Sequence, residues 1–177
     1  MPVSTVASLG QIAQELLTVA TDALDATVGG PVALSFLSPG LPSLDTMCDQ
    51  VIVWAPALGE EQTSPLSPTP ATGMRRRNGW LNLATLSILT ARCVNVGDVG
   101  AGGYQTPTTA ALDSDALKVM EDGWALWNAV NSAFVEDGLF DGTCKEFRIL
   151  STTALDPRGG LAGWTMVVQV ELAGYRT

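Results

Sequence analysis

The sequence predicts an α/β protein of the α+β kind, in which a mostly antiparallel β-sheet is packed by two long helices and joined by long loops. Residues 164–173 alternate between apolar and polar side chains with a period of two, apart from Val167. A strand-like run at 144–154 precedes them across the turn formers of 155–160, which predicts an antiparallel hairpin. Two segments of helical periodicity supply the cover that a hairpin with one apolar face requires.

The length of the chain, 177 residues, suits a single domain over residues 1–177. A chain of this size buries roughly 70% of the surface that its unfolded form exposes, so it holds a core of its own. No run approaches the ~20 apolar residues of a membrane span, and the first residues lack the pattern of a signal peptide. We therefore expect a soluble protein that is made and kept in a cytoplasm.

The first predicted helix begins at Ser4 or Thr5 and runs to about Ala26. Its apolar residues recur at spacings of three and four, which places them on one face. They are Val6, Leu9, Ala13, Leu16, Ala20 and Leu24. Ser4 or Thr5 caps the first amides, and Gly29-Gly30-Pro31 stops the helix, because proline cannot extend it.

Three further segments are candidate strands. Residues 32–37 are either a short strand or an extended loop, whereas residues 47–55 are a clearer strand, closed by Pro56. Residues 80–94 form a long strand with apolar residues on both sides of its alternation. This pattern predicts cover on both faces, by a helix on one side and a neighbouring subunit on the other.

Two long loops are expected, at 59–79 and 97–110. The first is rich in Pro, Ser and Thr with little apolar periodicity, and the second is rich in Gly. Loops beyond ~15 residues are usually functional or mobile. We expect both loops to be flexible.

The second predicted helix begins near Asp113, with 113–115 supplying an N-cap and negative charge, and Gly138 ends it. We expect its apolar face to cover the sheet. This face comprises Ala116, Met120, Gly123, Trp127, Val130 and Phe134, with Leu117, Trp124 and Asn131 alongside. Trp124, Trp127 and Trp164 are interpreted as packing residues.

The sequence contains few candidates for catalysis or cofactor binding. It has no histidine, which removes the commonest general base and most transition-metal sites. The glycines at 97–103 match neither dinucleotide nor phosphate-loop spacing. Glu60-Glu61 and Glu121-Asp122 are adjacent carboxylates that point apart, so we interpret them as solvated surface. We expect no enzyme activity, no cofactor and no metal.

The three cysteines, Cys48, Cys93 and Cys144, are odd in number and far apart, with no CxxC pair. This spacing favours neither a disulfide framework nor a zinc site. Each lies in or beside a strand-like run. We interpret them as buried thiols that pack as small apolar groups.

A net charge of -9 argues against a general nucleic-acid binder, because phosphate neutralisation needs clustered Lys and Arg. Arg75-Arg76-Arg77, followed by Asn78 at the end of the first long loop, is the exception. Three guanidinium groups suit phosphates or carboxylates. Contact with the acidic surface of a partner subunit, plain solvation and nucleic-acid contact all stay open. Arg75, Arg76, Arg77 and Asn78 are the candidate partner-contact residues.

The element order, together with short stretches such as TARCV at 90–94 and GGLAGW at 159–164, resembles the tail terminator (tail-completion) proteins of long-tailed phages with non-contractile tails. The similarity is closest to those of actinobacterial phages and covers most of the chain. It implies a sheet backed by helices and a structural role without catalysis.

The resemblance also implies a hexameric ring on the head-proximal end of the tail tube, where it stops tube polymerisation and joins the tail to the neck. The implied partners are identical copies, the major tail tube protein and a neck or head-completion protein, with DNA only as cargo passing through the lumen. The implied location is the tail–neck junction of the virion after assembly in the host cytoplasm, with no membrane contact.

Two alternatives stay open. One is a neck or head-completion connector protein of the same virion. The other is a cytoplasmic small-molecule-binding module or enzyme, with a pocket between the sheet and the loop at 97–110. The lack of histidine and of a phosphate loop weighs against this second alternative.

Overall fold

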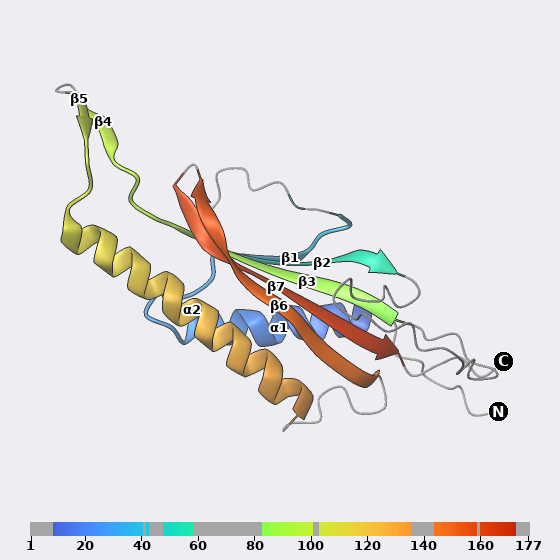
Figure 1. Cartoon of the computed structure of the whole chain (residues 1–177). Helices are drawn as coiled ribbons and strands as arrows, with labels where there is room; N and C mark the ends of the chain where they lie inside the picture. The colour runs from blue at the N-terminus through green and yellow to red at the C-terminus, as the bar shows by residue number, and fades with distance from the viewer. Residues whose placement is uncertain are drawn as a thin grey trace, which may run out of the picture.

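Five strands form a mixed sheet in the order β1-β2-β3-β7-β6, and two helices pack on one of its faces (Figure 1). The computed structural model describes residues 9–40, 42, 48–58, 83–100, 103–135, 144–158 and 160–172. The sheet strands are β1 (Leu34–Leu37), β2 (Gln50–Leu58), β3 (Leu83–Cys93), β6 (Cys144–Arg158) and β7 (Leu161–Leu172). β1 and β2 pair in parallel and the other neighbours pair antiparallel, so the predicted α+β class is confirmed.

β6 and β7 form the predicted antiparallel hairpin. Both strands extend further than predicted, which leaves two residues between Arg158 and Leu161. One of these is Gly160, whose φ of 82° lies in the left-handed region that glycine tolerates. The predicted alternation of β7 is confirmed, since its inward residues Met166, Val168 and Val170 are fully buried.

β3 lies at the centre of the sheet and has buried side chains on both faces. Ala84, Leu86 and Ile88 pack with the two helices in the main core. On the opposite face, Leu89 and Ala91 are buried in a smaller cluster with Ile52 and Trp54 of β2. Residues of the same chain therefore pack on both faces, and contact with a neighbouring subunit stays a prediction.

The two strands before β3 differ from their predicted bounds. The segment left open at 32–37 contains the short strand β1. β2 begins at Gln50 and continues past Pro56 to Leu58, so the prediction that Pro56 closes it is wrong. A register shift between Trp54 and Ala57 accommodates the proline, which has no N–H to donate to the ladder.

The helix α1 (Leu9–Asp25) carries the predicted buried face. Ala13, Leu16, Ala20 and Leu24 are all buried, whereas Ser4, Thr5 and Val6 lie outside the described residues. After the helix, the Thr27 amide donates to the Leu24 carbonyl at 3.0 Å, and Gly30 has a φ of 75°. The predicted stop at the paired glycines is therefore confirmed.

The predicted loop at 97–110 contains regular structure. β4 (Asp98–Gly100) and β5 (Gly103–Gln105) pair into a small hairpin that projects beyond the sheet (Figure 1). The helix α2 (Thr109–Val135) follows, so it begins before Asp113. Its cap is Thr108, whose hydroxyl accepts the Ala111 amide at 3.2 Å, and not 113–115 as predicted. Gly138 lies outside the described residues.

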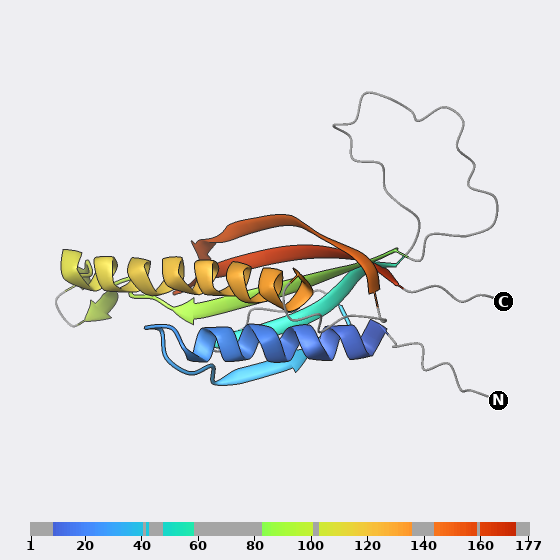
Figure 2. The ribbon, with the colours of Figure 1, turned by 90° about the horizontal axis from the view of Figure 1, so that it is seen from below.

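α1 and α2 lie side by side on the same side of the sheet (Figure 2). α2 approaches β7 closely at Gly123, where a Cβ would overlap the indole of Trp164. The Trp164 indole N–H donates to the Val119 carbonyl at 2.6 Å, so the interpretation of Trp164 as a packing residue is confirmed.

Candidate functional site

The side of α2 that meets the sheet carries two buried carboxylates, Asp115 and Asp122. They are seven residues apart, which places them on the same side of the helix. Asp122 is 1% exposed and Asp115 is 6% exposed. The same side continues with Leu126, Val130 and Ala133, so it is polar in its first half and apolar in its second.

Arg92, near the end of β3, forms a buried ion pair with Asp122. Its Nε lies 2.7 Å from Oδ2 of Asp122, and its Nη2 lies 3.3 Å from Oδ1. Nη1 contacts the Asp49 carboxylate at 3.4 Å, and Nη2 donates to the Leu24 carbonyl at 3.4 Å. The Thr27 hydroxyl also donates to Asp122. This Arg92 cluster therefore joins both helices to the sheet.

Two carboxylates, those of Asp122 and Asp49, pair with the buried Arg92 guanidinium. Burial is the largest single effect and lowers the pKa of Arg92, but the hydrogen bonds and negative charges of Asp122 and Asp49 together outweigh it, so the pKa is raised. Gly29 leaves the room that the guanidinium needs, since a Cβ there would lie 2.8 Å from Nη2. The interpretation of Asp122 as solvated surface is therefore wrong, while Glu60-Glu61 lies outside the described residues.

Asp115 makes a second anchor for α2. Its Oδ2 accepts the Asn95 backbone amide at 2.8 Å and the Asn95 side-chain amide at 2.7 Å, and Lys118 lies 3.4 Å from Oδ1. The Asn95 backbone hydrogen bond is the main cause that lowers the pKa of Asp115, against the effect of burial. With Asp122, this anchor fixes the rotation of α2 about its axis.

Cys48 and Cys93 form a disulfide with a Cα–Cα distance of 5.0 Å, so the interpretation of these cysteines as thiols is wrong. The pairing of β2 with β3 explains it. Gln50 lies opposite Ala91, and continuing that register outward by two residues places Cys48 opposite Cys93. Cys144 retains its thiol, as predicted, but it is half-buried and not fully buried.

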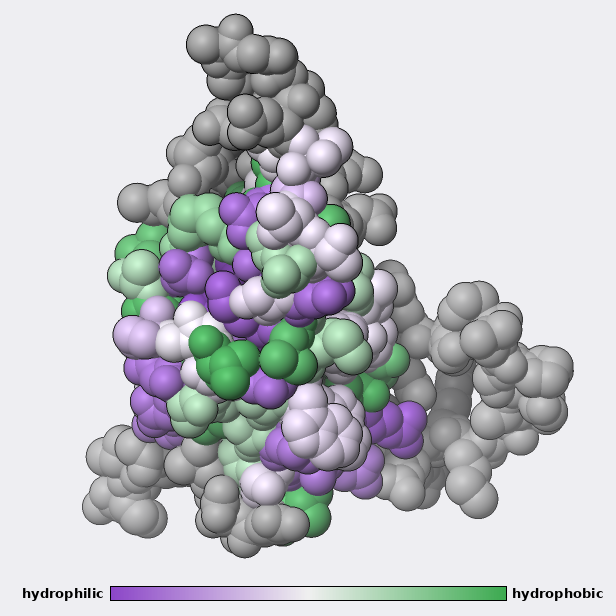
Figure 3. All heavy atoms as spheres, turned by 90° about the vertical axis from the view of Figure 1, so that its left-hand side faces the viewer, coloured by the Kyte–Doolittle hydropathy of each residue, from purple (hydrophilic) through white to green (hydrophobic). Residues whose placement is uncertain are grey.

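The side of α2 that faces away from the core is apolar and exposed. Its exposed fractions are 53% for Leu117, 66% for Met120, 66% for Trp124, 38% for Trp127 and 63% for Val135. We call these five residues the α2 apolar face. Figure 3 views this side of the molecule and shows apolar side chains gathered among hydrophilic ones. The rings of Trp124 and Trp127 stack with centroids 5.7 Å apart.

The α2 apolar face contradicts part of the predicted orientation of this helix, since Gly123 and Val130 face the sheet and Phe134 packs against the core as predicted. Met120, Trp124 and Trp127 were expected against the sheet and are exposed instead. The buried Asp115 and Asp122 explain the error, because hydropathy alone assigns aspartates to the solvent side. Their partners on β3 and in the segment after it turn α2 so that its large apolar residues point outward.

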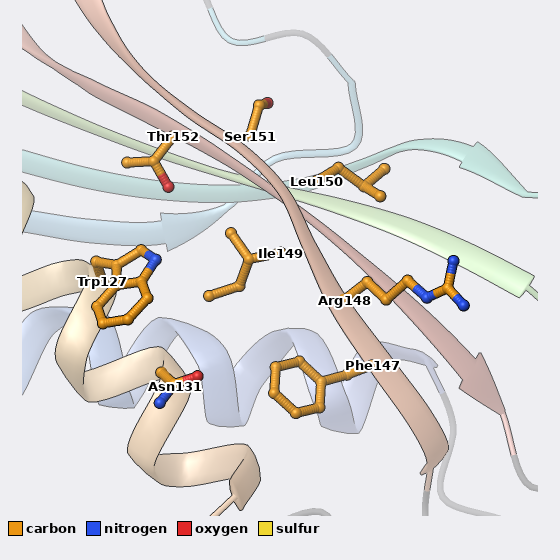
Figure 4. Close-up of a pocket in the computed structure, with 8 residues that line it drawn as sticks. All are labelled: Trp127, Asn131, Phe147, Arg148, Ile149, Leu150, Ser151 and Thr152. Carbon is orange, nitrogen blue, oxygen red and sulfur yellow. The ribbon is translucent and has the colours of Figure 1, made fainter. Parts of the chain in front are cut away.

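An open groove lies beside the α2 apolar face. It is lined by Trp127 and Asn131 of α2 and by residues 147–152 of β6, and we call it the α2–β6 groove. Figure 4 shows Phe147 and Ile149 pointing toward the helices, whereas Arg148 points away. The Thr152 hydroxyl is buried there without a hydrogen-bond partner in the described structure.

β6 is an edge strand, so its outer backbone groups pair with no other described strand. The site therefore combines an exposed apolar helix face, a shallow groove and an open strand edge. Such a surface suits burial against another protein chain, through apolar contacts and through main-chain hydrogen bonds.

The remaining predicted site residues, Arg75, Arg76, Arg77 and Asn78, lie outside the described residues, and partner contact there stays a prediction. Within the described part of the chain, no group of three or more His, Cys, Asp or Glu is placed to hold a metal ion. None of the described helices is both long and apolar enough to cross a membrane.

No protein-family model matches the chain, and a search of curated proteins finds no match.

Proposed function

We propose that this protein is a structural virion protein, a tail terminator that forms a hexameric ring on the head-proximal end of a phage tail tube. The ring stops tube polymerisation and joins the tail to the neck. The observation that carries the proposal is the α2 apolar face beside the open edge of β6. Copies of the chain that associate through this surface remove it from water.

The size of the α2 apolar face supports association. If the value of about 150–250 Å² for an aromatic side chain is taken as an upper limit for all five residues, their exposed fractions amount to at most roughly 400–700 Å² of apolar surface. The largest apolar patch of a typical monomer is about 300–600 Å² and is often functional, so a patch of this size marks a candidate contact surface. A standard protein–protein interface takes about 800 Å² from each partner, so this face supplies part of one side.

The internal position of the main charged cluster also supports a structural role. Arg92 and Asp122 are buried and paired, and their hydrogen bonds hold α1, α2 and β3 together. The buried Arg92 and Asp122 therefore link elements of the fold and do not face a substrate, whereas the Asp49 carboxylate beside them is 39% exposed.

The mass of the assembled protein tests the proposal. We expect native mass spectrometry to show six copies, either for the purified chain or for the chain mixed with the tail tube protein of the same phage. We also expect electron microscopy to show the ring at one end of the tubes, with tube growth stopped. A ring that binds the neck but leaves tube growth unchanged would favour the connector alternative. A chain that stays monomeric, binds a metabolite and does not bind the tube protein would overturn the proposal.

A further inference from the structure

Among the described residues, the sheet ends in β6 on one side and in β1 on the other, and no further described strand pairs with either edge. A closed ring of identical copies requires two different surfaces on each copy, which meet head to tail. Building on the proposed ring, we infer that the β6 edge and the α2 apolar face of one copy bind the β1 edge of the next copy.

The strand directions suit this contact. β1 is parallel to β2, while β2, β3, β7 and β6 alternate in direction, so β6 runs opposite to β1. In a ring whose axis lies along the strands, every copy keeps the same strand direction. The β1 of the neighbour then runs antiparallel to β6, which is the more stable kind of pairing.

β6 also contains an uninterrupted segment that is long enough for the short β1. The pairing of β6 with β7 shifts between Ile149 and Ser151 and again between Leu155 and Arg158. Such irregularities hinder the addition of a further strand. Between them, residues 151–155 pair without interruption, and this segment is long enough to accept the four residues of β1.

Apolar side chains flank both edges on the same side of the sheet. Leu37 of β1 is 38% exposed, and its pairing with Val53, a residue of the main core, places it on the helix side. The α2 apolar face lies on that side at the other edge. When the edges join, Leu37 of one copy lies toward the α2–β6 groove of its neighbour, where apolar contact displaces water.

Paired surface variants test this contact. Trp124→Glu changes the β6 side and Leu37→Glu changes the β1 side, and each adds one negative charge at an exposed position. Gln14→Glu on the exposed side of α1 is the matched control. We expect Trp124→Glu and Leu37→Glu each to lose the ring and remain monomeric, and the control to form it as the wild type does. Circular dichroism and melting temperature check folding, with Met120→Glu and Ser35→Glu as second variants.

The decisive measurement is an equimolar mixture of Trp124→Glu and Leu37→Glu, followed by native mass spectrometry. Each variant retains the surface that the other has lost, so we expect a complex of two chains that grows no further.

Two results would overturn the inference while leaving the proposed ring intact: a normal ring from Leu37→Glu, or pairing of Leu37→Glu with itself through two α2 faces. A wild-type chain that never forms a ring, even with the tube protein, removes the proposed function and this inference together.

Discussion

The two helices lie on the same face of the sheet, but the first half of α2 distributes its side chains differently from α1. α1 buries its large apolar residues and turns polar ones such as Gln14 and Asp22 to solvent. α2 buries Asp115 and Asp122 and turns Met120 to solvent. The difference teaches that available partners decide which side of a helix is buried. Carboxylates go inward where an arginine and backbone amides pair with them.

Removal of one charge from the buried pair should have the largest effect. Asp122→Ala leaves the Arg92 guanidinium buried without its main partner, and we expect about 3–5 kcal/mol of lost unfolding free energy. Denaturant unfolding measures the change. Asp22→Ala on the exposed side of α1 is the control, for which we expect a change within about 0.5 kcal/mol. Equal effects of the two substitutions would contradict the anchoring role of Asp122.

Shortening an apolar side chain should lower the unfolding free energy much more at a buried position of α1 than at an exposed position of α2. Leu16 of α1 is fully buried, so Leu16→Ala should cost about 2–5 kcal/mol. Met120 of α2 is 66% exposed, so Met120→Ala should change the stability of the monomer by no more than about 0.5 kcal/mol. Thermal and denaturant unfolding of dilute protein compare them. A large cost for Met120→Ala in a monomer would show that this residue is buried.

Reduction of the Cys48–Cys93 disulfide should have a smaller effect. The bond ties the end of β3 to the segment before β2, next to the Arg92 cluster. A disulfide of this kind contributes about 2–4 kcal/mol, so we expect a lower melting temperature in reductant. Cys93→Ser should lose the response to reductant, whereas Cys144→Ser should keep it. If reductant leaves the melting temperature of the wild type unchanged, the result would contradict the presence of the disulfide.

Acid should weaken the second anchor of α2. The lowered pKa of Asp115 means that its contribution to stability is complete above the ordinary aspartate pKa of about 4. That contribution falls as the pH drops through the lower pKa of the folded state. Asp115→Asn should therefore flatten the stability profile below pH ~4. Unfolding measured across this range in both proteins checks it, and identical profiles would contradict the shift.

The parts of the fold that follow a simple hydropathy pattern could be predicted from the sequence. Apolar and polar residues alternate along β7 because one side of the strand packs on the helices. The apolar residues of α1 recur at spacings of three and four because that side of the helix packs in the core. The hairpin of β6 and β7 is equally apparent, since turn formers separate two strand-like runs. In each case burial follows hydropathy.

Other features depend on contacts between distant residues. The rotation of α2 depends on Arg92 and Asn95, whose pairing with Asp122 and Asp115 no local pattern shows. The spacing of Asp115 and Asp122 by seven residues is the one local signal of this rotation, because two carboxylates buried on one side of a helix require a basic or hydrogen-bonding partner. The Cys48–Cys93 bond follows from the register of β2 and β3. The sequence of each strand alone does not reveal that register.

The candidate surface was missed for the same reason. Trp124 and Trp127 are aromatic residues at helical spacing, and this pattern is most often typical of a core. Their exposure depends on a contact between distant parts of the chain, because the neighbouring Gly123 packs against the indole of Trp164. The other predicted contact, at Arg75–Arg77, stays a prediction outside the described residues.

The Cys48–Cys93 bond closes a covalent loop, since these residues are 45 positions apart in the sequence. A protease that cuts the backbone once between them leaves both pieces attached to each other through sulfur. The arginines at 75–77, where trypsin cleaves, lie inside this loop. A nicked chain therefore keeps its full mass on a gel without reductant and separates into two fragments only when a thiol is added.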